Sequence, residues 1–180
     1  MPGKILVAFA TMSGTTRESA EAIGEELRRS GNEVHVKHVR EVRSVEGYTA
    51  AVVGTPVMGG FLNWGCTRFL KRNRTALGTM PVACFVACGA MSDPTDENKA
   101  TARKYVDKMR NVAPAIEPVD TVAFGGALKA DGPDFERANP FLKFIIPKLA
   151  SEFKDGRDFD AIRAWARGLS EKLSRDTKEP

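Results

Sequence analysis

Apolar runs and segments of helical periodicity alternate along this chain. The runs cover residues 4–10, 33–39, 50–54, 82–87 and 119–124. The second run alternates valine with polar residues, which is typical of a strand at a sheet edge. The first, third and fourth runs are nearly all apolar, as in strands that are covered on both faces. Strands that alternate with helices in this way indicate an α/β protein with a doubly wound parallel sheet.

The helical segments carry apolar stripes and recognisable ends. The stripe of the first helix consists of Thr16, Ala20, Ile23 and Leu27. Thr15 and Glu18 have the spacing of a capping box at the start of this helix. Asp93 and Pro94 fit the N-cap and the first residue of a later helix that runs to about Arg110. The stripe of the last helix consists of Ile162, Trp165, Ala166, Leu169 and Leu173.

One interval, residues 129–156, breaks the alternation between the fifth strand and the last helix. The remaining pattern contains no internal repeat and no low-complexity linker. We therefore predict a single domain over residues 1–180, with five parallel strands and a helical insertion at 129–156. We expect only residues 175–180 to be frayed.

Composition adds that the chain is an ordinary globular protein, with 42% hydrophobic and 28% charged residues. No apolar run approaches the ~20 residues of a membrane-spanning helix. The start of the chain lacks the longer apolar region and the cleavage site of a signal peptide, so we expect a cytoplasmic protein. Cys66, Cys84 and Cys88 do not have metal-ligand spacing, and we expect reduced thiols and no metal site.

The charge balance narrows the range of partners. The net charge is +4 and the pI is about 9.0, which suits acidic proteins or an anionic membrane surface. The basic residues are scattered and form no recognition motif, so we expect no nucleic-acid partner.

The loop after the first strand groups small hydroxyl residues around one glycine. It consists of Thr11, Met12, Ser13, Gly14, Thr15 and Thr16. The start of a helix offers unpaired N–H groups and a partial positive charge, and Gly14 lets the backbone curl closely around an anion. The loop can therefore bind a phosphate group without a lysine or an arginine. The alternative is a hydroxyl-rich helix cap with no ligand, although a cap needs only one such residue.

Other phosphate-binding classes do not fit this loop. A dinucleotide fingerprint needs three glycines, and a Walker loop needs a lysine. A low-molecular-weight phosphatase would carry a cysteine here, and a response-regulator receiver would carry an aspartate where this chain has Gly54 and Thr55.

The arrangement Thr-x-Ser-Gly-x-Thr at residues 11–16 resembles the phosphate loop of flavodoxins, with Thr15 where asparagine is common. The resemblance implies a sheet of order 2-1-3-4-5 and FMN held by the loops after the first, third and fourth strands. These loops would be residues 11–16, 55–62 and 87–93. The cofactor-binding residues it implies beyond the first loop are Thr55, Pro56, Val57, Met58, Gly59, Gly60, Phe61, Ala87, Cys88, Gly89 and Ala90.

The second and third loops differ in what they offer a flavin ring. Gly59 and Gly60 can reorient a peptide group at low cost, and such groups tune the cofactor. Phe61 or Trp64 is a candidate for stacking on the ring, or is part of the core. The third loop holds no aromatic residue, although flavodoxins usually place a tyrosine there. One face of the flavin ring would then be open, or would be covered by Met91. An open face suits an enzyme that brings a substrate to the flavin better than it suits a sealed electron carrier.

The insertion contains a short apolar helix. Asn139 and Pro140 can open it, and Pro147 is expected to kink or end it. The largely apolar segment from Phe141 to Leu149 has several possible roles. It can contact the cytoplasmic face of a membrane peripherally, line a pocket over the flavin, cover the sheet edge or form a dimer contact.

The position of the insertion extends the resemblance. Residues 122–128, the basic insertion after them, and the entry into the last helix at Asp158 and Phe159 are similar to bacterial menaquinone-dependent protoporphyrinogen oxidases. That family implies an FMN-dependent oxidoreductase of heme biosynthesis that passes electrons from a porphyrinogen to a quinone. No His-carboxylate or Ser-His pair occurs in the three loops, so we predict no catalytic side chain. The alternatives are a flavodoxin-type electron carrier with a redox protein partner, an NAD(P)H-quinone reductase, and a flavin-free structural protein.

Overall fold

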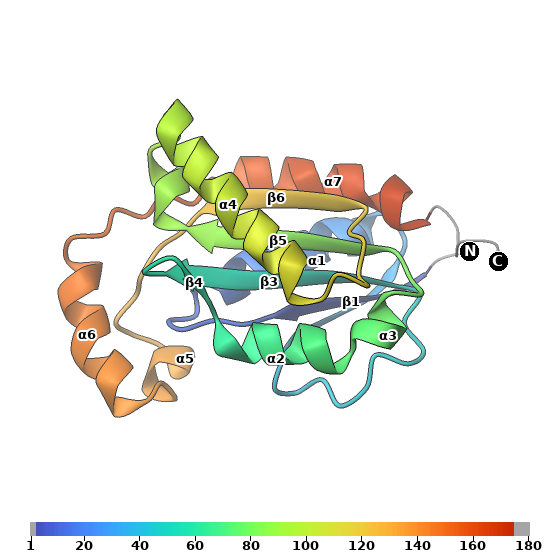
Figure 1. Ribbon diagram of the computed structural model, residues 1–180, viewed down its shortest axis with the longest axis horizontal. Helices are drawn as coiled ribbons and strands as arrows, with labels where there is room; N and C mark the ends of the chain where they lie inside the picture. The colour runs from blue at the N-terminus through green and yellow to red at the C-terminus, as the bar shows by residue number, and fades with distance from the viewer. Residues whose placement is uncertain (1–2, 175–180) are drawn as a thin grey trace.

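A computed structural model describes residues 3–174, and the predicted frayed residues 175–180 lie outside this range. The sheet has the order β2-β1-β3-β5-β6, and these five strands pair in parallel (Figure 1). The strands are β1 (Lys4–Phe9), β2 (Glu33–His38), β3 (Ala50–Met58), β5 (Val82–Cys88) and β6 (Asp120–Gly125). The order 2-1-3-4-5 that the flavodoxin resemblance implies for the parallel strands is confirmed, and so is the α/β fold class that the sequence pattern predicts.

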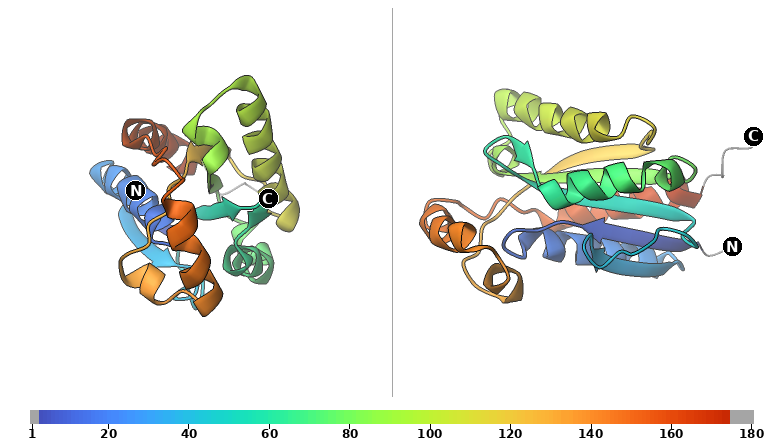
Figure 2. Two further views of the ribbon diagram at one scale, coloured as in Figure 1. Left: turned by 90° about the vertical axis from the view of Figure 1, so that its left-hand side faces the viewer. Right: turned by 60° about the horizontal axis from the view of Figure 1, so that its bottom comes forward.

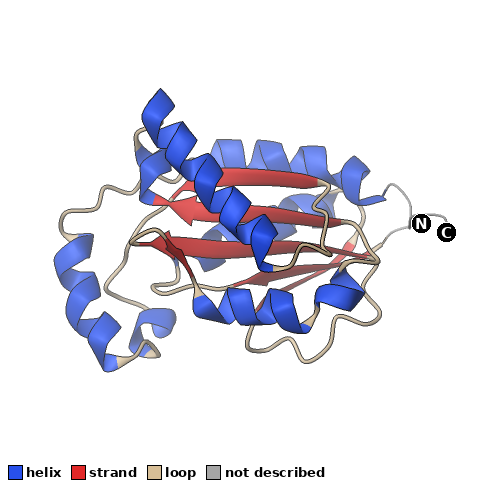
Figure 3. Cartoon of the chain, in the orientation of Figure 1, coloured by secondary structure: helices blue, strands red, loops and turns tan. Residues whose placement is uncertain are grey.

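Helices cover both faces of this sheet (Figures 1 and 3). The helices α1 (Thr15–Arg29) and α7 (Phe159–Ser174) lie on one face, and α2 (Trp64–Arg72), α3 (Arg74–Leu77) and α4 (Asp96–Val112) lie on the other. Alternate side chains of each central strand enter different cores. In β1, Leu6 and Ala8 join the core under α2 and α4, whereas Val7 and Phe9 join the core under α1 and α7. This double burial explains why the central strands are almost wholly apolar.

The second predicted loop, residues 55–62, forms a hairpin for most of its length. β3 continues to Met58 and pairs in antiparallel fashion with a sixth strand, β4 (Phe61–Leu62). Gly59 and Gly60 make the turn with positive φ angles of 56° and 81°, as tight hairpin turns require. The prediction of a strand that ends at Gly54 and of five strands in all is corrected accordingly.

Two helix starts also differ from the prediction. α4 begins at Asp96, and Thr95 is its N-cap, accepting a hydrogen bond from the Asn98 N–H at 3.2 Å. The 3₁₀ helix η1 (Gly89–Ser92) precedes it, so Asp93 and Pro94 belong to the connection. In α1 the N-cap is Gly14 without a side-chain cap, so the predicted capping box is wrong.

The insertion forms two helices, α5 (Pro133–Glu136) and α6 (Pro140–Ala150), beyond the carboxyl ends of the strands (Figures 1 and 2). As predicted, the Asn139 side chain caps α6, accepting a hydrogen bond from the Leu142 N–H at 2.9 Å. Pro147 lies inside α6 and does not end it. Within residues 3–174, no helix has the length and apolar character needed to cross a membrane.

Candidate cofactor-binding site

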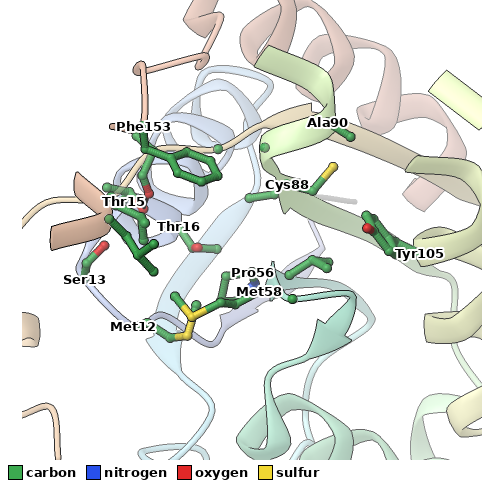
Figure 4. A pocket seen from close by; sticks show the side chains of 18 of the residues that line it. Met12, Ser13, Thr15, Thr16, Pro56, Met58, Cys88, Ala90, Tyr105 and Phe153 are labelled. Carbon is green, nitrogen blue, oxygen red and sulfur yellow. Dashed lines mark hydrogen bonds between the residues drawn. The ribbon is translucent and has the colours of Figure 1, made fainter. Parts of the chain in front are cut away.

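A cavity of about 540 Å³ lies at the carboxyl ends of β1, β3 and β5, inside the usual range of about 300–1,000 Å³ for small-molecule sites. Ligands of open α/β sheets bind where neighbouring connections diverge to opposite faces, which here is between β1 and β3. The lining is mainly apolar (Figure 4). It consists of Met12, Ser13, Thr15, Thr16, Pro56, Val57, Met58, Gly59, Gly60, Ala87, Cys88, Gly89, Ala90, Tyr105, Gly126, Ala127, Leu128, Leu149 and Phe153.

The first loop bends sharply before α1. Gly14 has a φ of 85°, a left-handed conformation that glycine adopts at little cost. Its N–H donates a hydrogen bond to Thr11 Oγ1 at 2.9 Å, which closes the turn. The first N–H groups of a helix have no partner within it. The turn therefore presents the amino end of α1 to the cavity, as an anion site requires.

Three hydroxyl groups of this loop have different environments. Ser13 Oγ accepts a hydrogen bond from the Lys129 N–H at 3.3 Å, and Thr15 Oγ1 donates one to the Ala127 carbonyl at 2.8 Å. Thr16 Oγ1 is buried and has no hydrogen-bond partner among the described residues. Buried polar atoms of native proteins are normally paired. An unpaired hydroxyl on the wall of the cavity, at a helix start, fits the phosphate group of FMN (Figure 4).

Most of the sequence-predicted residues of the three loops line the cavity. The exceptions are Thr11, Gly14, Thr55 and Phe61. Thr11 and Gly14 shape the first turn, and the buried Thr55 accepts a hydrogen bond from the Asn63 N–H at 3.3 Å. The Phe61 side chain is 77% exposed. This geometry does not support a stacking role for Phe61.

Sequence reasoning missed the lining residues that come from outside the three loops. Tyr105 belongs to α4, residues 126–128 follow β6, and Leu149 and Phe153 belong to the insertion. For the insertion, pocket lining was one of the open alternatives, and two of its residues do line the cavity. No local signal identifies Tyr105, because its position depends on how α4 packs.

Cys88 contributes a small apolar wall to the cavity. Partial burial raises the pKa of its thiol, although backbone hydrogen bonds from residues 90 and 91 oppose the shift. The group is therefore a neutral thiol at neutral pH, and a low-pKa thiolate would be needed for a reactive role.

Ion pairs fix both ends of the insertion to the first turn of α1. Glu18 accepts hydrogen bonds from Lys129 Nζ and from the Arg157 guanidinium, each at 2.6 Å. The Arg157 side chain is only 5% exposed and also pairs with Asp155 at 2.6 Å. Partial burial would raise the pKa of Glu18, but the hydrogen bonds from Lys129 and Arg157 outweigh it, so this pKa is lowered.

A third ion pair joins α1 to α5. The Arg17 guanidinium donates two hydrogen bonds to the Asp134 carboxylate, at 2.7 and 3.0 Å. The hydrogen bond from Arg17 lowers the pKa of Asp134 against the opposing effect of burial. Arg17 lines a second, polar cavity of about 300 Å³ and is not part of the first cavity's lining. The phosphate loop thus faces the cavity without a cationic side chain.

These ion pairs predict that acid releases the insertion. Glu18 and Asp134 have ordinary pKa values of 4.5 and 3.8 and lower values in the folded protein. A lowered carboxyl pKa contributes stability that is complete above the ordinary value and is lost as pH falls through the folded value. Pulse proteolysis with pepsin from pH 4.5 downward should therefore cut residues 129–157 before the sheet. Equal susceptibility of the insertion at pH 4.5 and pH 2.5 would contradict this.

Comparisons with known proteins identify the family of this chain. Residues 6–158 match the family model for the flavodoxin domain. Protoporphyrinogen IX dehydrogenase (quinone) of Escherichia coli (strain K12) is 24% identical over 185 residues, which cover 97% of this chain and 98% of that protein.

Two solved structures share the fold at lower identity. A flavodoxin from the domain Archaea aligns with a TM-score of 0.58 and 17% identity, covering 96% of this chain and 99% of that chain. A flavoprotein of Lactobacillus acidophilus NCFM in complex with FMN aligns with a TM-score of 0.51 and 14% identity, covering 67% of this chain and 93% of that chain. Together with the cavity and its phosphate loop, these findings support FMN as the cofactor, as the sequence predicts. The chain belongs to the flavodoxin domain family.

Proposed function

We propose that this protein is an FMN-dependent oxidoreductase that exchanges electrons with a quinone and with a porphyrinogen. The observation that carries the proposal is the apolar cavity with an uncharged phosphate loop at one side and the insertion at another. Bound FMN would supply the capacity to accept and return two electrons. The chain's own residues would bind, orient and shield the cofactor.

Each part of the cavity has a distinct task in this proposal. The amino end of α1 and the unpaired Thr16 hydroxyl would hold the phosphate. Pro56, Met58 and Ala87 form apolar walls that would exclude water from the ring. The Gly59–Gly60 peptide groups would offer the ring backbone hydrogen bonds. No side chain needs to act as an acid or a base.

The substrate class rests on the E. coli relative and on the insertion. That relative is aligned over nearly the whole of both chains, and its name gives protoporphyrinogen and quinone as its reactants. The insertion adds Leu149 and Phe153 to the cavity wall. An additional apolar wall beside the cofactor is more typical of an enzyme that binds large apolar reactants than of an electron carrier whose cofactor is sealed from solvent.

The test uses the FMN-loaded protein under anaerobic conditions. Protoporphyrinogen is mixed with the oxidised form, and a menaquinone analogue, a ferredoxin or NADP⁺ is mixed with the photoreduced form, each followed at the flavin absorption band. The proposal predicts bleaching by porphyrinogen and recovery with the quinone. Exchange with ferredoxin alone would indicate an electron carrier. Exchange with the nicotinamide and the quinone, but not with the porphyrinogen, would indicate an NAD(P)H-quinone reductase. Either of these results would overturn the proposal.

The outer face of α6 supports a second part of the proposal, a peripheral contact with an anionic membrane. Phe141 and Phe144 are 69% and 66% exposed, and Lys148 Nζ lies 4.2 Å from the centre of the Phe144 ring. α6 contains two lysines and no acidic residue. Aromatic side chains that lie among lysines suit the boundary between headgroups and acyl chains. Such a contact would bring the cavity close to a membrane-dissolved quinone.

Replacing both exposed phenylalanines should abolish most of this binding. Burial of a phenylalanine side chain contributes about 1.5–3 kcal/mol, so F141S/F144S should lower the partition coefficient by at least about tenfold. The measurement is co-sedimentation with phosphatidylserine-containing vesicles. V119S, which changes a partly exposed residue beside the amino end of β6, is the control. No binding of wild type to either kind of vesicle would refute the membrane contact, and equal binding to neutral and anionic vesicles would refute the preference for an anionic surface.

A further inference from the structure

The third loop, which follows β5, lacks an aromatic residue, but an aromatic ring lies directly on its backbone. The ring belongs to Phe153, which follows α6 in the insertion. A Cβ atom on Gly89 would lie 2.5 Å from Phe153 Cε1, so only a glycine leaves room for the ring in this position. Figure 4 shows the Phe153 ring extending into the cavity, with Tyr105 on the opposite side of the view.

We propose that Phe153 is the side chain against which the flavin ring stacks, so that the insertion supplies the aromatic wall missing from the third loop. This inference rests on the proposed FMN binding. Phe153 is 43% exposed although it lines an apolar cavity. A flat aromatic ligand would cover that surface and gain the offset contact that aromatic pairs favour.

The backbone around Phe153 is held firmly enough for such a role. The Phe153 N–H donates to the Leu149 carbonyl at 2.9 Å, and the Gly156 N–H donates to the Gly126 carbonyl at 3.0 Å. The Gly126 N–H in turn donates to the Cys88 carbonyl at 3.0 Å. Phe153 is thus tied to the ends of both β5 and β6, next to the third loop.

Charge contacts extend this link to the phosphate loop. Arg157 follows Phe153 by four residues and pairs with Glu18 in the first turn of α1 at 2.6 Å. The same turn carries Thr16, the residue with the unpaired hydroxyl. The two ends of a bound FMN would therefore be held by one connected set of contacts.

The experiment compares FMN dissociation constants and flavin fluorescence of wild type, F153L and F153W. We expect F153L to weaken FMN binding by about tenfold, because the stacked ring is lost. F153W should retain tight binding and should lower the fluorescence of the bound flavin, because an indole that stacks on the flavin ring donates an electron to the excited flavin, which a phenyl ring does not. F144L, which changes an exposed phenylalanine of the same insertion, should leave both quantities unchanged.

The substitution G89A tests the same contact from the other side. The added methyl group would displace the Phe153 ring, so G89A should weaken FMN binding, and its effect should largely disappear in the F153L background. Tighter FMN binding by F153L would mean that the Phe153 side chain occupies the place of the flavin ring. Unchanged FMN binding and flavin fluorescence in the Phe153 variants would mean that Phe153 does not touch the flavin ring. Either result overturns the stacking and leaves FMN binding intact. Failure of the wild type to bind FMN would overturn both proposals.

Discussion

The substitution Thr16→Val is expected to weaken FMN binding by about 10–100-fold and, at the same time, to stabilise the ligand-free protein. Thr16 Oγ1 is buried without a partner among the described residues. A hydrogen bond to a charged group contributes about 1.5–3 kcal/mol, which corresponds to this loss of affinity. An unsatisfied buried polar group costs about 1–3 kcal/mol, which valine removes. A loss of FMN affinity together with a gain in the stability of the ligand-free protein distinguishes a ligand-binding hydroxyl from a structural one.

Calorimetric titration with FMN and thermal unfolding of the ligand-free protein measure the two effects. Thr16→Ser is the matched control, since it keeps the hydroxyl group, and it should retain most of the affinity. If Thr16→Val lowers both the affinity and the stability, the hydroxyl has a structural partner, and its assignment to the phosphate is wrong.

The substitution Gly125→Ala is expected to destabilise the protein by about 1–3 kcal/mol, as overpacking of a closed site does. Gly125 ends β6, and a Cβ atom there would overlap the backbone carbonyl of Gly156. This overlap can be relieved only if the carboxyl end of the insertion moves away from the sheet. For a chain of this size the midpoint of thermal unfolding should fall by roughly 2–12 °C.

The control for this prediction is Gly168→Ala in α7. Apart from its chain neighbours and its own helix backbone, no atom of the described residues lies within 4 Å of a Cβ atom built at Gly168. Alanine is favoured over glycine in a helix by about 1 kcal/mol. Circular dichroism should therefore show a lower melting temperature for Gly125→Ala and a higher one for Gly168→Ala. An unchanged midpoint for Gly125→Ala would mean that the insertion is not seated against β6.

The central strands were predictable because burial on both faces makes them almost wholly apolar, whereas their order followed from the resemblance of residues 11–16 to the flavodoxin phosphate loop. In β1, both Leu6 and Val7 are apolar, since they enter different cores. The phosphate loop was predictable for a similar reason, because Gly14 and its hydroxyl neighbours are consecutive residues. The hairpin was not predictable from local pattern. Its second strand has only two residues. β3 extends past Gly54 first by pairing with β5 at residues 55 and 56, and then by pairing with β4 at residues 57 and 58.

The capping-box error arose because distant residues compete with local ones. Thr15 and Glu18 have capping-box spacing, but Thr15 donates to Ala127, and Glu18 pairs with Lys129 and Arg157. Contacts with residues more than a hundred positions away in the sequence therefore replace the local cap. Phe153 reaches the cavity for the same reason, since its place depends on how the insertion returns to the sheet.

The most direct test of the account is the difference between FMN and riboflavin, which share the ring and differ in the phosphate. Calorimetric titration of the ligand-free protein with each compound measures it. If the first turn of α1 holds the phosphate through N–H and hydroxyl groups, FMN should bind at least about 100-fold more tightly than riboflavin. Equal dissociation constants, or no binding of either flavin, would contradict the account.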